Sequence, residues 1–168
     1  VCDTNTKKPV VRDGKTLGEV LFRGNMVMKG YLKNKHANKE TFRNGWFHTG
    51  DLAVIHSDGY LELKDRSKDI IISGGENISS IEIEKIISKN PNVHDCAVIG
   101  IEDKKWGEVP CAIIERKNNK LTKEDIIKFC RKHLAGFKMP KRIIFSSLPR
   151  TSTGKIQKFN LRILAKKL

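Results

Sequence analysis

The chain of 168 residues has few aromatic residues, few acidic residues and no long hydrophobic run. Phe, Trp and Tyr make up 7% of it, and they are not interleaved with the basic residues, as the stacking side chains of a nucleic-acid-binding surface are. No apolar run approaches the roughly 18 residues that suggest a membrane-spanning helix. We therefore expect neither a nucleic-acid partner nor an integral membrane segment.

The sequence also lacks the residue spacing of a metal site. Its four cysteines, Cys2, Cys96, Cys111 and Cys130, form no Cys-x-x-Cys pair, and its five histidines are scattered. We therefore expect no structural metal. Cys96 and Cys111 lie in apolar runs, where a thiol acts mainly as a small hydrophobic group. Buried, reduced thiols are typical of a cytoplasmic protein.

Basic residues are concentrated in the last third of the chain. The formal net charge is +14, and residues 117–168 alone hold 15 Lys or Arg residues against 2 Asp or Glu residues, a net charge of +13. Such a block raises the local concentration of small polyanions by long-range attraction. Two alternatives stay open: a lysine-rich surface that serves solubility, and a basic module that binds nucleic acid without any of the usual motifs.

Hydrophobic patterning predicts a β-rich first part and a mixed second part. Alternating runs predict strands at residues 19–23 and 60–64, a hairpin turn at 57–59 and a short helix at 35–42. The second part is predicted to contain strands at 70–72, 96–100, 109–115 and 142–145, and helices at 80–89, 123–133 and 159–167. This order, β-α-β-β-α-β-α, is typical of a small α+β domain.

A polar segment at residues 65–69 (DRSKD) separates the two parts. Because domain boundaries fall in exposed polar links, we predict one unit at residues 1–66, a hinge at 67–68 and a second unit at 69–168. The chain begins with Val1 rather than Met. We therefore expect it to be a piece of a longer protein.

The most informative motif is residues 149–156 (PRTSTGKI), in which Lys155 follows a turn that ends in Gly154. Gly, Ser and Thr favour a tight corner here. A phosphate-binding P-loop is excluded, because it requires glycine at position 149 and Ser or Thr at position 156, where this chain has Pro and Ile. Taken alone, the motif is weak evidence for a ligand site, and a solvated loop lysine explains it better.

Three further motifs precede it: residues 47–52 (FHTGDL), 65–69 (DRSKD) and 73–80 (SGGENISS). In this order and spacing, the four motifs resemble the C-terminal third of the AMP-forming acyl-CoA synthetases, which belong to the adenylate-forming enzyme superfamily. The resemblance extends over nearly the whole chain. It implies an α+β fold, in which residues 1–66 end a large domain and residues 69–168 form a mobile lid with a mixed sheet and about three helices.

The resemblance implies an enzyme that joins a carboxylic acid to CoA with ATP, releasing AMP and pyrophosphate. ATP, Mg²⁺ and CoA would be its cofactors, and a fatty or short-to-medium-chain acid its substrate. The phosphate loop and acyl pocket of such enzymes would lie upstream, so the chain alone is expected to be inactive. A homo-oligomer remains open. The rival readings are a peptide-synthetase adenylation domain, which passes its acyl group to a carrier protein, and the nucleic-acid module.

By the same resemblance, three residues would act on the nucleotide and the acid. Lys155 would bridge substrate carboxylate and phosphate oxygens during adenylation. Asp51 would accept hydrogen bonds from the ribose hydroxyls, and Arg66 would reach the same sugar. Otherwise, Asp51 would only stabilise a turn, and Arg66 would only be a surface ion-pair partner of Asp65.

The remaining candidates concern movement and CoA. Lys68 matches the pivot on which the second domain rotates, with an ordinary loop lysine as the alternative. Ser73, Gly74 and Gly75 resemble the loop that lines the pantetheine tunnel, although a strand-to-helix turn would also need glycine. Glu76 departs from relatives that carry a basic residue here, so the resemblance gives no phosphate contact at this position.

Overall fold

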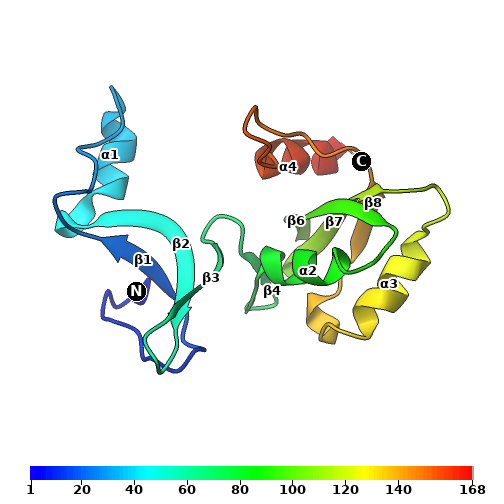
Figure 1. Cartoon of the computed structure of the whole chain (residues 1–168), viewed down its shortest axis with the longest axis horizontal. Helices are drawn as coiled ribbons and strands as arrows, with labels where there is room; N and C mark the ends of the chain where they lie inside the picture. The colour runs from blue at the N-terminus through cyan, green and yellow to red at the C-terminus, as the bar shows by residue number, and fades with distance from the viewer. Residues whose placement is uncertain (168) are drawn as a thin grey trace. The chain divides into compact units, whose positions relative to one another are not determined.

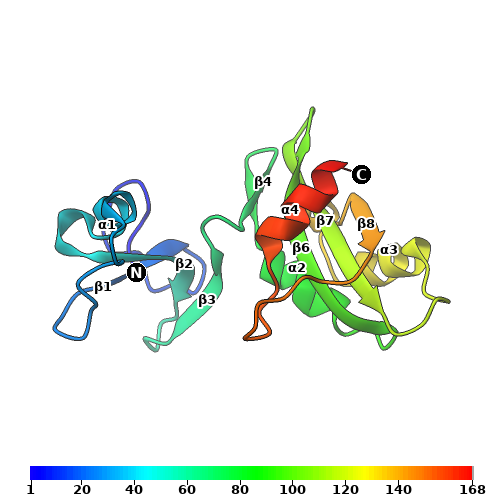
Figure 2. The same ribbon diagram turned by 90° about the horizontal axis from the view of Figure 1, so that it is seen from above.

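The computed structural model describes residues 1–167. The chain divides into two compact units, Val1–Lys68 and Asp69–Leu168, and each unit has a β-sheet of its own (Figures 1 and 2). The division falls inside the polar segment 65–69.

The first unit is built on a three-stranded antiparallel sheet in the order β1-β2-β3. Its elements are β1 (Gly18–Phe22), α1 (Lys35–Thr41), a 3₁₀ turn (Arg43–Gly45), β2 (Phe47–Ile55) and β3 (Leu61–Arg66). The predicted short helix, the two predicted strands and the hairpin turn are confirmed. In that turn, the backbone N–H of Gly59 donates to the carbonyl of His56 at 2.9 Å.

Strand β2 was not predicted, because Gly50 interrupts its pattern of alternating side chains. The sequence at residues 47–52 was interpreted as a turn followed by a carboxylate. In the structure the strand runs through Gly50, which has a φ of +72°. Downstream, Leu52, Ala53 and Val54 of β2 are buried and supply much of this unit's small core.

The second unit contains a five-stranded mixed sheet in which β5, β4, β7 and β6 are antiparallel neighbours and β8 pairs in parallel with β7. Its elements are β4 (Ile71–Ser73), β5 (Glu76–Ile78), α2 (Ser80–Ile87), β6 (Val93–Asp103), β7 (Gly107–Arg116), α3 (Lys123–Arg131), a 3₁₀ turn (Gly136–Lys138), β8 (Arg142–Phe145) and α4 (Lys158–Lys167). A parallel pair needs a crossover, and α3 lies in the one between β7 and β8. The predicted α+β class, with a mixed sheet and three helices, is confirmed.

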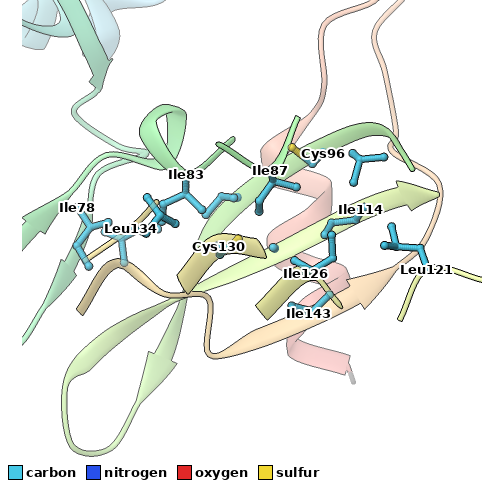
Figure 3. Close-up of a cluster of buried hydrophobic side chains, with 14 residues drawn as sticks. Ile78, Ile83, Ile87, Cys96, Ile114, Leu121, Ile126, Cys130, Leu134 and Ile143 are labelled. Carbon is cyan, nitrogen blue, oxygen red and sulfur yellow. The ribbon is translucent and has the colours of Figure 1, made fainter. Parts of the chain in front are cut away.

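Helices cover both faces of the β6–β7 pair. On one face, Ala112 and Ile114 of β7 pack with side chains of α2 and α3, which Figure 3 shows as a single apolar cluster. On the other face, Cys111 and Ile113 pack with Leu161 and Ala165 of α4. Because successive strand residues point to opposite faces, one continuous apolar run serves both clusters.

The side chain of Ile83 on α2 is fully buried in the first cluster. We predict that Ile83→Ala lowers the free energy of unfolding by about 2–5 kcal/mol, because the removed atoms leave a cavity in a packed core. Ile163→Ala on α4, where the side chain is 43% exposed, is the control and should change it by less than about 1 kcal/mol. Urea unfolding of both variants measures the difference, and equal losses would contradict this packing.

Candidate functional site

The backbone around Asp51 bulges out of the β1–β2 ladder. Glu19 pairs with Leu52 and Leu21 pairs with His48, so residues 49–51 of β2 lie opposite a single residue of β1. A bulge of this kind bends a strand and redirects its side chains. It turns the candidate carboxylate away from the regular pleat.

A buried carboxylate on β1 holds this bulge in place. Oε1 of Glu19 accepts the backbone N–H of Gly50 at 3.1 Å, and its Oε2 lies 2.8 Å from Nδ1 of His48, which is also buried. The guanidinium of Arg43 lies 3.6 Å from Oε2. These partners offset the cost of burying the charge. Sequence reasoning gave Glu19 and His48 no role, although a glutamate inside a short apolar strand is a signal that could have found the first.

Asp51 and Arg66 are direct cross-strand neighbours on β2 and β3. Nε of Arg66 lies 3.1 Å from Oδ1 of Asp51, and both side chains are about half exposed. An exposed pair contributes only about 0–1 kcal/mol, so stability does not account for it. The ion pair that the structure gives this guanidinium is with Asp51, and Asp65 accepts the backbone N–H of Arg66 at 2.8 Å. Within residues 1–167, Oδ2 of Asp51 and the Nη atoms of Arg66 have no further hydrogen bond.

Two buried aspartates enclose the link between the units. Asp65 is the next-to-last residue of β3, and Asp69 is the first residue of the second unit. Asp69 accepts a hydrogen bond from Nη2 of Arg162 at 2.6 Å. Between the two aspartates, Arg66, Ser67 and Lys68 are exposed. The part of the link free of buried side chains is therefore short.

Gly74 and Gly75 form the two-residue turn of a β4–β5 hairpin. Both have positive φ, +59° and +88°, as a type I′ turn requires. Strand β5 was missed by the sequence analysis, which predicted a glycine-rich loop here; its first two residues, Glu76 and Asn77, are exposed and give no apolar signal. A Cβ at position 74 would lie 2.8 Å from Cε3 of Trp106, whereas one at position 75 would meet nothing within 4 Å. Backbone geometry therefore favours glycine at both positions, and the Trp106 ring adds a steric reason at position 74.

The loop that carries Lys155 is closed by its own hydrogen bonds. Arg150 and Ile156 form an antiparallel bridge at its base. The backbone N–H of Thr151 donates to the carbonyl of Lys155 at 2.8 Å, and the N–H of Lys155 donates to Oγ1 of Thr151 at 3.1 Å. Gly154 takes the corner with a φ of +84°. Within residues 1–167, the exposed ammonium group of Lys155 has no hydrogen bond or ion pair.

The candidate residues therefore form separate groups. Asp51 and Arg66 lie together in the first unit, next to the link, whereas the 73–75 turn and Lys155 belong to different segments of the second unit. No group of three or more His, Cys, Asp or Glu residues in the described part of the chain could hold a metal ion. No helix among the same residues is long and apolar enough to cross a membrane.

The buried cysteines are not candidates for catalysis. Burial raises the pKa of Cys96, Cys111 and Cys130 to about 11, because a thiolate is poorly solvated among apolar side chains. The thiolate is the reactive form. These three thiols are therefore unreactive near neutral pH.

Comparison with known proteins points to one family. Residues 82–155 match the family model of the AMP-binding enzyme C-terminal domain. The chain is 56% identical to an acetate/butyrate–CoA ligase, peroxisomal, of Arabidopsis thaliana, covering 100% of this chain and 31% of the ligase. It is 54% identical to a trans-cinnamate:CoA ligase, peroxisomal, of Petunia hybrida, covering 99% of this chain and 30% of that ligase.

A solved structure agrees. The crystal structure of ATP-bound MatB from Rhodopseudomonas palustris superimposes with a TM-score of 0.89 at 37% sequence identity, covering 99% of this chain and 33% of MatB. The chain spans about a third of the length of the relatives it matches.

The contrast between the two turn glycines is testable. Gly75→Ala should cost about 1–2 kcal/mol, because only the left-handed backbone is strained. Gly74→Ala should cost a further 1–3 kcal/mol or so, because its methyl group also collides with the Trp106 ring. Unfolding free energies of the two variants give the comparison. In a Trp106→Ala background, the loss of unfolding free energy caused by Gly74→Ala should fall to that of Gly75→Ala. If the larger loss persists in that background, the ring is not its cause.

Proposed function

We propose that this chain, whose residues 82–155 match the AMP-binding enzyme C-terminal domain, is the C-terminal part of an AMP-forming acyl-CoA ligase. The observation that carries the proposal is the identity of more than half of its residues to two CoA ligases over essentially the whole chain. The complete enzyme would convert ATP, a carboxylic acid and CoA into acyl-CoA, AMP and pyrophosphate.

The reaction has two steps. A carboxylate oxygen attacks the α-phosphorus of ATP, the bond to the pyrophosphate leaving group breaks, and an acyl-adenylate forms. The CoA sulfur then attacks the acyl carbon, AMP leaves, and the thiol proton is released. Both steps develop negative charge on oxygen, which preorganised cations stabilise.

Lys155 is the residue that we assign to the first step. Its ammonium group would contact oxygens of the substrate carboxylate and of the α-phosphate. Support comes from its exposure at the corner of a closed loop, where no hydrogen bond or ion pair to it occurs among the described residues. A lysine suits this task because its charge is compact and carries three donors.

Asp51 and Arg66 are assigned to the ribose of the nucleotide. A carboxylate can accept hydrogen bonds from two vicinal hydroxyl groups. The pair supports this role because one oxygen of Asp51 binds Arg66, while its second oxygen accepts no hydrogen bond from any residue that the structure describes. The bulge held by Glu19 would keep that second oxygen in position.

The link and the hairpin turn are assigned to the second step. Lys68 would be the pivot about which the second unit rotates, between the two buried aspartates. Ser73, Gly74 and Gly75 would line the passage for the pantetheine arm of CoA. Mg²⁺ would accompany ATP. The described residues contain no cluster that fits Mg²⁺, so we assign this chain no part in holding it.

The substrate is proposed only as a class, a small carboxylic acid. The relatives' names range from acetate and butyrate to trans-cinnamate, and the acyl pocket would lie in the part of the ligase that this chain does not span. A fatty or short-to-medium-chain acid, a cytoplasmic location and a homo-oligomer stay predictions. The two relatives described above are both named peroxisomal.

The test is ATP–pyrophosphate exchange and thioester formation by the full-length protein with acetate, butyrate, cinnamate and longer fatty acids. We expect both activities in the full-length protein and neither in the 168-residue chain. Exchange without transfer to CoA would favour an enzyme that uses another acceptor, such as a carrier protein. No exchange with any acid would favour the nucleic-acid module, whose binding to duplex DNA should fall with salt by about 0.9 logarithmic units per phosphate contacted.

We predict that Lys155→Ala in the full-length enzyme lowers adenylation by about 10²–10³-fold, the usual cost of removing one preorganised donor to a developing oxyanion. Thioester formation from supplied acyl-adenylate should be little changed. Lys120→Ala, at another exposed lysine, is the control and should affect neither step. Equal loss in both half-reactions would refute the role of Lys155.

We predict that Lys68→Pro uncouples the two half-reactions, because proline fixes φ near about −65° at the pivot. Single-turnover adenylation should persist while steady-state acyl-CoA formation falls. Lys68→Ala removes the side chain but leaves the backbone free, and should keep most of the activity. Unchanged steady-state kinetics in the proline variant would place the hinge elsewhere.

A further inference from the structure

Arg150 and Lys158, which flank Lys155 in the chain, form ion pairs, whereas Lys155 forms none with any residue in the described part of the chain. On the N-terminal side, Arg150 pairs with Asp95 of β6, lies 3.6 Å from Glu115 of β7, and donates to the carbonyl of Gly154 at 3.2 Å. This arginine therefore ties the base of the loop both to the sheet and to the corner beside Lys155.

On the C-terminal side, the tie is Lys158, the first residue of α4. Its Nζ lies 2.7 Å from Oε1 of Glu84 and 2.6 Å from Oγ of Ser80, both on α2. The same Oε1 accepts the backbone N–H of Val98 on β6 at 2.7 Å. Lys158 thus connects the start of α4 to a second helix and, through Glu84, to the central sheet.

The Lys158–Glu84 pair is more buried than an ordinary surface ion pair. The side chains of Lys158 and Glu84 are 17% and 19% exposed. Charges in such a position are little screened by salt, and each depends on the other for solvation. Near the other end of α4, Lys166 lies 3.7 Å from Glu102, and these side chains are 75% and 88% exposed. The same helix therefore offers a tight lysine pair and a loose one.

A second anchor lies one turn further along the same face of α4. Residues four apart on a helix are neighbours on one face, and Arg162 binds the little-exposed Asp69, the first residue of the second unit. Helix α4 packs on β6 (Figure 2). Its ion-paired face is thus attached to α2, to the sheet and to the residue that follows the link.

We propose that Lys158 is a positioning residue for Lys155, acting through Glu84 and Ser80. It fixes the first turn of α4, and the two residues between Lys155 and Lys158 transmit that position to the loop corner. The inference rests on the proposed adenylation role of Lys155. Lys158 itself needs no contact with substrate.

The experiment compares Lys158→Met with Lys166→Met in the full-length enzyme, since each removes one lysine charge from α4 and keeps an unbranched side chain. We expect Lys158→Met to lower adenylation by about 10-fold to 100-fold, the scale of a 1 Å misplacement. Thioester formation from supplied acyl-adenylate should stay within about twofold. Lys166→Met should leave both half-reactions unchanged.

A double-mutant cycle with Lys155→Ala separates positioning from a general structural role. If Lys158 acts through Lys155, adding Lys158→Met to Lys155→Ala should lower adenylation by less than about twofold more. An undiminished loss in that background, equal loss in both half-reactions, or equal behaviour of the two methionine variants would overturn the proposal. Lys155→Ala without any effect would instead refute the adenylation role of Lys155, and absence of ATP–pyrophosphate exchange in the unmodified enzyme would refute the proposed function.

Thermal unfolding of each variant accompanies the kinetics. Should Lys158→Met fail to fold, Glu84→Gln gives the same test, because it keeps the shape of the partner while removing its charge. It should likewise lower adenylation selectively and lose that effect in the Lys155→Ala background. A folded Glu84→Gln enzyme with normal adenylation would overturn the proposal.

Discussion

The β6–β7 pair buries side chains on both of its faces, and the rest of the second unit follows from that constraint. A sheet that is apolar on both sides must be covered twice. Helices α2 and α3 pack on one face and α4 on the other. Because α4 has to dock there, the loop immediately before it is brought to a defined place at the edge of the unit. The position of Lys155 is in this sense a consequence of core packing.

Charged residues in the two units fall into two kinds. Glu19, Asp69 and Glu84 are little exposed and hold backbone or neighbouring cations in place. Asp51, Arg66 and Lys155 are more exposed and retain hydrogen-bonding capacity that residues 1–167 do not use. An unpaired polar group costs little in water and much in the interior. Structural carboxylates are therefore found inside, and the groups proposed to meet a ligand are found outside.

Much of this could be predicted from the sequence, and the exceptions have physical causes. Strand β8 and helix α4 are predicted almost to the residue, because a short apolar run marks the strand and apolar residues three and four apart mark the helix. Strand β2 was missed because Gly50 breaks the alternation, and β5 because its exposed residues carry none. The α+β class follows from the order of the predicted elements and the family from the order of the motifs, whereas the Glu84–Lys158 and Glu19–Gly50 contacts join residues far apart in the chain. The local sequence pattern gives no information about contacts between residues so far apart. The roles of Asp51, Arg66 and Lys155 stay proposals.

Helix α4 comes after the strands that it covers in the sequence, and this order affects how the protein folds during synthesis. The strands it covers are complete by Phe145, whereas its core residues Leu161 and Ala165 follow some fifteen to twenty positions later. At a synthesis rate of about 5–20 residues per second, the apolar face of Ala97, Ile99, Cys111 and Ile113 waits about one to four seconds for its cover. During that interval the nascent chain presents a finished sheet with one bare side, which is the kind of surface that chaperones bind.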